Sequence, residues 1–270
     1  MSEPGVETME ASRGLRPPQA RRAERRHLRL FDPSVGANGD GAGAVAARPE
    51  VSAGLGPVER AILRGLNVVV AAGALLLLAP VFLVIAVAIR LDSRGPVIYR
   101  QLRVGLDRRS GAGADSTGRR RTDLGGRPFT IYKFRTMRVD AEDATGPVWA
   151  RPRDGRVTRV GAVLRKTRLD ELPQFWNVIR GEMSVVGPRP ERPNFVLELR
   201  KEIDAYAMRH RVPPGITGWA QVNRGYDRNV EDVREKLGYD LEYLEKRSIW
   251  FDLLIMLRTI PVMLERDKSC

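Results

Sequence analysis

One apolar stretch dominates the hydrophobic pattern, from Leu66 to Ile89, where LNVVVAAGALLLLAPVFLVIAVAI contains no charged residue. As a straight helix it would reach about 36 Å, which exceeds the ~30 Å hydrocarbon core of a bilayer. Pro80 lies near its middle, where it removes a helical hydrogen bond and favours a kink. Arginines flank both ends, at Arg60, Arg64, Arg90 and Arg94. Because neither end is favoured as cytoplasmic, we predict a re-entrant membrane helix over residues 59–90, with a spanning helix as the alternative.

Two segments alternate apolar and polar residues in the manner of strands, VIYRQLR at 97–103 and FTIYKFRTM at 129–137. A polar insert at 107–127, rich in Gly, Ser and Arg, lies between them and predicts a long tip. Period-two geometry places Lys133 and Arg135 on one face of the second strand. Two cations on one face could bind phosphate, and a merely polar strand face is an equally good interpretation.

Later segments have the helical period. The pattern predicts a short helix over Val157–Thr167 and another that begins at Pro193. The core-facing residues of the second helix are predicted to be Phe195, Leu199, Ile203 and Tyr206. Another amphipathic helix is marked by Val233, Leu237, Leu241 and Leu244. Between these two helices, PPGITGWAQVN at 213–223 has the Pro and Gly content of a structured loop.

The last apolar segment is IWFDLLIMLRTIPVMLE at 249–265, which is interrupted by Asp252, Arg258 and Pro261. These interruptions argue against a membrane span. The helix could lie in the membrane interface or pack on a core. The elements together predict an α/β fold of mixed, mostly helical content.

The composition narrows the class of partner. Residues 1–58 are rich in Gly, Ala, Pro, Ser and Arg and are predicted to form a disordered basic tail. The formal net charge of +13 predicts an anionic partner such as lipid, phosphorylated substrate or nucleic acid. The single cysteine, Cys270, excludes disulfides within the chain, and two histidines make a His/Cys zinc site a poor candidate. Any metal is therefore expected to be a hard cation on oxygen ligands.

The candidate chemistry is concentrated in RKTRLDELPQFWNVIRGEMSVVGPRP, residues 165–190. Asp170 and Glu171 lie among cations, just before a short helix predicted from Pro173 to Gly181. Such surroundings favour the ionised carboxylate. An ionised carboxylate among cations can attack a neutralised electrophile or hold a divalent metal. A capped helix with solvated charges is the simpler interpretation, but the rigid turn at Gly187–Pro190 argues for a built site.

Three motifs occur in order behind one hydrophobic helix: KFRTM at 133–137, LDELPQFWNVIRGEMSVVGPRP at 169–190 and PGITGWAQVN at 214–223. Together they resemble the bacterial sugar transferase family, the monotopic phosphoglycosyl transferases. The resemblance implies a single re-entrant membrane helix and a small cytoplasmic catalytic domain, residues 91–270, with amphipathic interfacial helices. It also implies a place on the cytoplasmic face of the bacterial inner membrane.

The resemblance further implies transfer of a sugar 1-phosphate from a nucleotide-diphosphate sugar, usually a UDP-sugar, to polyprenyl phosphate. The catalytic residues implied are Asp170 as nucleophile and Glu171 as Mg²⁺ ligand. The substrate-binding residues are expected to be Lys133, Arg135, Arg165, Pro188, Arg189 and Pro190. The lipid bilayer is an expected partner, a homodimer is a candidate, and nucleic acid is not expected. The sugar stays open.

The chain departs from the family pattern where Ala79 and Arg168 replace the usual serines, and where Arg224–Gly225 reverses the usual Gly-Arg order. With Ala79 in place of serine, no hydroxyl precedes Pro80 at the helix break. With the order Arg224–Gly225, Arg224 does not occupy the position of the family's arginine. The alternative function is a membrane-anchored basic module that binds nucleic acid or acidic lipid without catalysis. Aromatic residues, at 6% of the chain, are few for base stacking.

Overall fold

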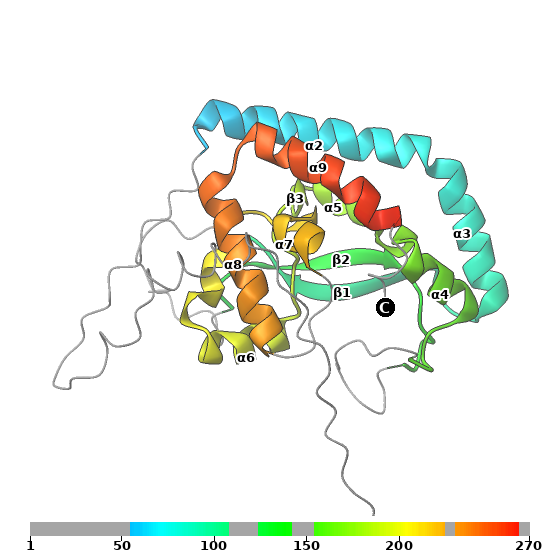
Figure 1. Cartoon of the computed structure of the whole chain (residues 1–270). Coiled ribbons are helices and arrows are strands. Elements are labelled where there is room, and N and C mark those ends of the chain that lie inside the picture. Colours follow the sequence, from blue (N-terminus) through cyan, green and yellow to red (C-terminus); the bar gives the residue numbers. More distant parts are fainter. Residues whose placement is uncertain (1–54, 108–123, 142–153, 225–229, 265–270) are drawn as a thin grey trace, which may run out of the picture. The chain divides into compact units, whose positions relative to one another are not determined.

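The computed structural model describes residues 55–107, 124–141, 154–224 and 230–264. The fold below is that of the unit formed by Arg48–Cys270. Nearly all of the predicted basic tail and most of the 107–127 insert lie outside the described residues. Within the described ranges the fold is α/β and mostly helical, as the pattern predicted (Figure 1).

The long apolar stretch forms two helices, α2 (Pro57–Leu77) and α3 (Ala79–Asp92). They meet at Leu78, with φ −91° and ψ 4°, and Pro80 occupies the first turn of α3. A proline in a first turn loses no helical bond that would otherwise form, so the break precedes it. Figure 1 shows α3 leaving the end of α2 at a steep angle. The break predicted at Pro80 is confirmed, whereas the re-entrant path through a membrane stays a prediction.

Exposed apolar side chains cover much of both helices. In the described ranges, α2 is the one helix long and apolar enough to cross a membrane by length and composition. The exposed large side chains of the two helices include Val69, Leu76, Leu77, Leu83, Val84, Val87 and Leu91. An apolar surface of this extent on a soluble monomer is unusual and is typical of contact with lipid or a partner.

One face of α2 is nevertheless joined to the rest of the domain. Asn67, which is 2% exposed, accepts a hydrogen bond from the Val185 amide at 2.5 Å. Arg64 donates to the carbonyls of Val178 and Ile179, at 2.6 and 2.7 Å. Both carbonyls lie in the last turn of a helix, where amide partners further along the helix run out, and the Val178 carbonyl also accepts from the Gly181 amide at 3.0 Å. The apolar helix is therefore fixed to the elements that carry the site described below.

Two small sheets form the β part of the fold. Strands β1 (Ile98–Val104) and β2 (Pro128–Phe134) pair antiparallel, which confirms the predicted strand pair. Strands β3 (Ser184–Val186) and β4 (Gly215–Thr217) pair in parallel. The predicted loop at 213–223 was therefore wrong in part, because it contains β4 and the short helix α7 (Trp219–Asn223). A β-carbon on Gly215 would lie 2.1 Å from the Gly187 nitrogen, so close backbone approach requires glycine there.

The remaining helices follow the predicted pattern. They are α4 (Arg159–Lys166), α5 (Gln174–Ile179), α6 (Pro193–Glu202), α8 (Val230–Lys246) and α9 (Ile249–Leu264), with 3₁₀ turns η2 (Leu169–Glu171) and η3 (Asp204–Arg211). Thr158 caps α4 by accepting from the Gly161 amide. Of the residues predicted to face the core, Leu199, Ile203 and Tyr206 are buried in one cluster, and Phe195 is partly buried against it beside the fully buried Val196. The predicted core face is therefore confirmed, although α6 ends at Glu202 and Tyr206 belongs to η3.

Helix α9 packs on the core along one side and is exposed along the other. Asp252 and Ile255 are both fully buried, whereas Trp250 is 81% exposed and Leu257 66% exposed. Asp252 accepts a hydrogen bond from the Tyr243 hydroxyl at 2.9 Å, which explains a carboxylate in so apolar a helix. Core packing is thus confirmed for one face. Whether the other face lies in a membrane interface stays a prediction.

Candidate active site

The two neighbouring carboxylates lie on the short turn η2, and two residues separate this turn from the start of α5. Arg168, just before the turn, has φ 58° and is the one non-glycine residue with positive φ in the described ranges. A large side chain in this conformation is strained, and such strain is found mostly at functional sites. Because α5 has only six residues and starts after the pair, charged side chains set the field around the acids more than the helix does.

Glu171 is held by two cations from distant parts of the chain. Lys133 Nζ on β2 donates to Oε1 at 2.8 Å. Arg189 reaches both oxygens, Oε1 through Nη2 at 2.5 Å and Oε2 through Nη1 at 3.3 Å. Burial alone would raise the pKa of Glu171, but Arg189 and Lys133 hold this pKa well below its usual range. Three predicted site residues therefore meet, and Glu171 is a fixed, ionised carboxylate.

Asp170 has a different environment from its neighbour. Over the described parts of the chain, its carboxylate accepts no hydrogen bond and forms no ion pair. Burial raises the pKa of Asp170 above its usual value, while the charge of Lys133 opposes the shift. The pKa of Asp170 is raised and that of Glu171 is lowered. Opposite shifts of this kind are typical of carboxylate pairs in which the two members have different roles. Asp170, unlike Glu171, has no bond to a described residue that holds its carboxylate in place.

The turn that presents Arg189 is held along its backbone. Four consecutive carbonyls, of Pro188, Arg189, Pro190 and Glu191, accept hydrogen bonds from four separate donors. These donors are the Gly215 amide at 3.0 Å, Arg209 Nη2 at 3.0 Å, Arg103 Nη1 at 3.0 Å and the Val104 amide at 2.9 Å. The predicted residues Pro188 and Pro190 are buried and restrict the torsions of this turn. They fix the direction of Arg189 and offer no donor of their own.

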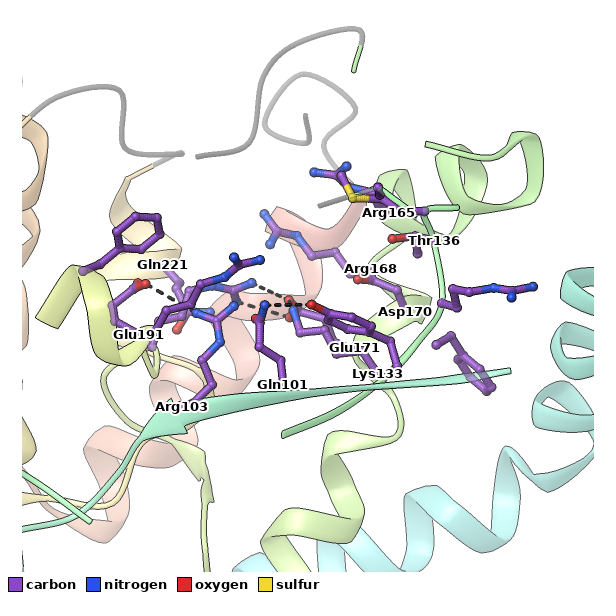
Figure 2. Close-up of a pocket in the computed structure, with 18 of the residues that line it drawn as sticks. Gln101, Arg103, Lys133, Thr136, Arg165, Arg168, Asp170, Glu171, Glu191 and Gln221 are labelled. Atoms are coloured by element: carbon purple, nitrogen blue, oxygen red, sulfur yellow. Dashed lines mark hydrogen bonds and ion pairs between the residues drawn. The ribbon is translucent and has the colours of Figure 1, made fainter. Parts of the chain in front are cut away.

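Arg165 and Arg168 lie on the other side of the acid pair. Both border the pocket that contains Asp170 and Glu171. Figure 2 shows them toward the same end of the pocket as Asp170, with Arg103, Glu191 and Gln221 toward the opposite end. The predicted residue Arg165 is thus near the carboxylates. Arg168, which the sequence indicated as a cation flanking the acid pair and as a departure from the family pattern, lies near them as well.

Arg135 borders the same pocket, but its guanidinium is engaged elsewhere. Nη1 donates to the Arg94 carbonyl at 2.7 Å, and Nη2 donates to the Ser93 carbonyl at 2.7 Å. A β-carbon on Gly95 would lie 2.1 Å from Arg135 Nη1, so the guanidinium fills the space beside that glycine. The structure gives Arg135 a structural contact with the end of α3. Its predicted role in substrate binding stays a prediction.

The pocket has a volume of about 570 Å³, which is in the range of small-molecule sites. Its walls come from both strands of the hairpin, α4, η2, the arginine turn (residues 188–191, which present Arg189), α6, η3, α7 and α8. Sequence reasoning missed several cationic residues that border it, namely Arg103, Arg192, Arg209 and Lys236. Arg103 had a usable signal, since Tyr99, Gln101 and Arg103 alternate along β1 and Tyr99 pairs with Lys133 across the hairpin. Arg224 also borders the pocket and pairs with Glu235 at 2.5 Å.

The donor set also suits a magnesium ion that is shared with a substrate. Magnesium takes one or two protein carboxylates and completes its shell with phosphate oxygens and water. Glu171, the predicted ligand, supplies one such carboxylate, and its two oxygens also accept from Lys133 and Arg189. The described residues contain no group of three or more acidic, histidine or cysteine side chains that could hold a metal. The residues present therefore fit a metal that binds together with an anionic ligand.

Comparison with known proteins identifies this arrangement. A family model described as bacterial sugar transferase matches residues 58–266, which include every residue of the site above. The chain belongs to this family. As a sugar transferase of this family it has, within the matched region, both the apolar helices and the carboxylate pair.

Several curated relatives of this sugar transferase have named activities. It is 44% identical over 208 residues to a UDP-N-acetylgalactosamine-undecaprenyl-phosphate N-acetylgalactosaminephosphotransferase of Aeromonas hydrophila, which covers 77% of this chain and 45% of the relative. It is 42% identical to a UDP-glucose:undecaprenyl-phosphate glucose-1-phosphate transferase of Escherichia coli (strain K12), over 76% of this chain and 41% of the relative. A Caulobacter vibrioides enzyme of the same name is 41% identical, over 79% and 75%. The chain thus spans less than half the length of the first two relatives.

Proposed function

We propose that this sugar transferase moves a sugar 1-phosphate from a UDP-sugar to a polyprenyl phosphate, through a phosphosugar ester on Asp170. One observation carries the proposal: a carboxylate without a partner lies next to one that two cations hold, in a pocket bordered by arginines. The named activities of the relatives support the reaction class. The proposal includes a place on the cytoplasmic face of the bacterial inner membrane, in contact with the bilayer.

The first half of the reaction uses the donor substrate. Arg189 and Lys133 bind the diphosphate and offset its charge, so an anionic carboxylate can approach phosphorus. An Asp170 oxygen forms a bond to the β-phosphorus, and the bond from that phosphorus to the bridging oxygen breaks. UMP leaves with the electron pair. Magnesium held by Glu171 and the diphosphate oxygens would further offset charge on the electrophile.

The second half of the reaction restores the carboxylate. A phosphate oxygen of polyprenyl phosphate attacks the same phosphorus, and the aspartyl oxygen–phosphorus bond breaks. The sugar is then joined to the lipid through a diphosphate, and Asp170 is again ionised. Dividing the transfer in this way replaces one difficult step by two easier ones. The apolar surface of α2 and α3 is where a lipid-bound acceptor would be expected to approach.

The test is UMP release by purified, detergent-solubilised protein with a panel of UDP-sugars, Mg²⁺ and polyprenyl phosphate. We expect one UMP per active site before the acceptor is added, and a labelled sugar on the protein that Asp170→Asn loses. Steady-state rates should give the parallel double-reciprocal lines of a ping-pong mechanism. Converging lines without a burst would mean direct transfer, and no UMP with any donor would favour the non-catalytic module.

A further inference from the structure

A buried ion pair links η3 and α8 beside the arginine turn. Arg209 is 8% exposed and Asp240 is 2% exposed, with Nη2 of the arginine 2.7 Å from Oδ2 of the aspartate. Nη1 of Arg209 donates to the Tyr206 hydroxyl at 2.7 Å. The planar guanidinium is therefore held at both of its terminal nitrogens.

The same guanidinium reaches the turn that carries Arg189. Nη2 of Arg209 donates to the Arg189 carbonyl at 3.0 Å, while the side chain of Arg189 contacts Glu171. Arg209 thus binds the backbone of Arg189, and Glu171 binds its side chain. A shift of the carbonyl would move the guanidinium that is expected to bind the diphosphate.

Stability alone is a poor explanation for this pair. Moving two charges out of water carries a large desolvation penalty, and apolar residues of similar volume often stabilise a protein as well or better. What apolar residues cannot supply is a fixed donor for the Arg189 carbonyl. A lysine cannot supply the same geometry either, because its single ammonium lacks the planar fork of arginine.

We propose that Arg209, held in place by Asp240, is a positioning residue that fixes the Arg189 turn for phosphate binding. It acts through Arg189 and does not need to contact the substrate. The expected effect on kcat/KM rests on the proposed function. The expected effect on the position of the Arg189 turn does not depend on the proposed function.

The kinetic test is a double-mutant cycle of Arg209→Lys and Arg189→Ala, read as kcat/KM for UMP release. Arg209→Lys alone should lower kcat/KM about ten- to hundredfold, the effect of a small misplacement of a binding group. In the Arg189→Ala background it should change kcat/KM by less than about twofold. Full additivity of the two losses, or wild-type kinetics for Arg209→Lys, would overturn the proposal, since a residue that contacts substrate itself loses its contribution in either background.

Two further variants separate positioning from folding. Arg209→Met/Asp240→Leu replaces the pair by apolar residues and should keep or raise the melting temperature while losing kcat/KM as Arg209→Lys does. Tyr206→Phe removes a contact of Arg209 that does not go to the turn, so it should lower stability with little change in kcat/KM. If the apolar double variant keeps wild-type kcat/KM, the pair does not position Arg189.

A structural readout keeps the proposal testable without turnover. Amide hydrogen exchange should quicken in the peptide spanning residues 184–195 of Arg209→Lys, and stay at the wild-type rate in Tyr206→Phe. If the wild-type protein releases no UMP with any donor, the proposed function fails and the exchange data still decide the positioning role. If it is active but exchange in this peptide is unchanged, only the positioning role fails.

Discussion

Asp170 and Glu171 are adjacent in the chain, yet Glu171 has both oxygens bound by Lys133 and Arg189 while Asp170 is bound by no described residue. The contrast supports the separate roles proposed for two carboxylates that the sequence presents as a pair. A carboxylate held by two cations is suited to orient and neutralise, because its position and charge are fixed. A carboxylate without such bonds can form a new one to phosphorus.

Asp170→Asn should abolish turnover and leave the fold intact. The amide has nearly the same shape but is not a nucleophile, and no hydrogen bond to described residues is lost. UMP release should fall to background, while the melting temperature should stay at or above that of the wild type, because burial raises the pKa of Asp170 and the amide removes the charge that burial disfavours. Glu171→Gln is the matched comparison. Glu171→Gln should slow the burst of UMP release and also lower stability, since it weakens the buried ionic contacts with Lys133 and Arg189.

A residual burst of UMP release in Asp170→Asn would contradict the assignment of Asp170 as the nucleophile.

Arg135→Lys should act on stability more than on substrate binding. The substitution keeps one positive charge but cannot donate to the Ser93 and Arg94 carbonyls together, as the guanidinium does. We expect a loss of about 1–3 kcal/mol in the free energy of unfolding, the range for buried groups left without partners. The KM for the UDP-sugar should stay within about twofold, a free-energy change under 0.5 kcal/mol. A large rise in KM with unchanged stability would restore Arg135 to the substrate-binding set.

The contacts of Arg135 show where strand alternation stops predicting side-chain direction. The pattern assigned Lys133 and Arg135 to one face, but β2 ends at Phe134. Beyond the last strand residue the period of two no longer fixes side-chain direction. Arg135 still borders the pocket, but its guanidinium is bound to the Ser93 and Arg94 carbonyls, a contact that the alternation could not predict.

Contacts between residues far apart in the chain could not be predicted from local periodicity. The helices at 157–167 and 193 onward, and the strand pair, followed from local periodicity and were found. Asp240 has a local signal for burial, because it lies three residues after Leu237 and four before Leu244 on the apolar face of the predicted helix. Nothing local indicates that Arg209 is its partner. Their partnership across 31 positions arises only when α8 packs on η3. The meeting of Lys133, Glu171 and Arg189 was anticipated through the family resemblance and not through periodicity.

Asn67→Leu should weaken the join between the apolar helix and the site. Leucine is close to asparagine in size, but the buried Val185 amide would lose its acceptor. We expect the unfolding free energy to fall by about 1–3 kcal/mol, and kcat to fall with it because β3 leads directly into the arginine turn. Val69→Leu is the matched control on the exposed face of α2, and should change neither quantity. Wild-type stability of Asn67→Leu in detergent and in bilayers would refute this coupling.

The topology of α2 and α3 can be tested by labelling from outside intact cells. If the chain enters and leaves the membrane on the cytoplasmic side, single cysteines at position 10 and position 150, each in a Cys270→Ser background, should both resist a membrane-impermeant reagent. Pro80→Leu should straighten the junction at Leu78, since an interior proline disfavours a continuous helix by about 3 kcal/mol. The variant should then expose position 10 to the reagent. Labelling of position 10 in the protein with Pro80 intact would mean that the helix spans.

Asp252 should make stability depend on pH in a direction opposite to that of most carboxylates. Burial raises the pKa of Asp252 to about 6, against the opposing effects of the Tyr243 hydrogen bond and the Arg247 charge. Between the usual aspartate pKa near 4 and this value, the folded chain binds the proton more tightly than the unfolded chain. The contribution of this group to stability is therefore fully present below about pH 4 and is lost as the pH rises through about 6.

Asp252→Asn removes this dependence and keeps an oxygen that can accept from the Tyr243 hydroxyl. Two pKa units correspond to roughly 3 kcal/mol, so the variant should be more stable than wild type by that order at pH 7.5. At pH 4 the two proteins should unfold at similar temperatures. Asp252→Ala is the control, because it removes the charge and also leaves the Tyr243 hydroxyl without its partner, which should cancel part of the gain. Thermal unfolding at the two pH values checks both. If Asp252→Asn is less stable than wild type at pH 7.5, the ionised carboxylate stabilises α9 and burial does not dominate its titration.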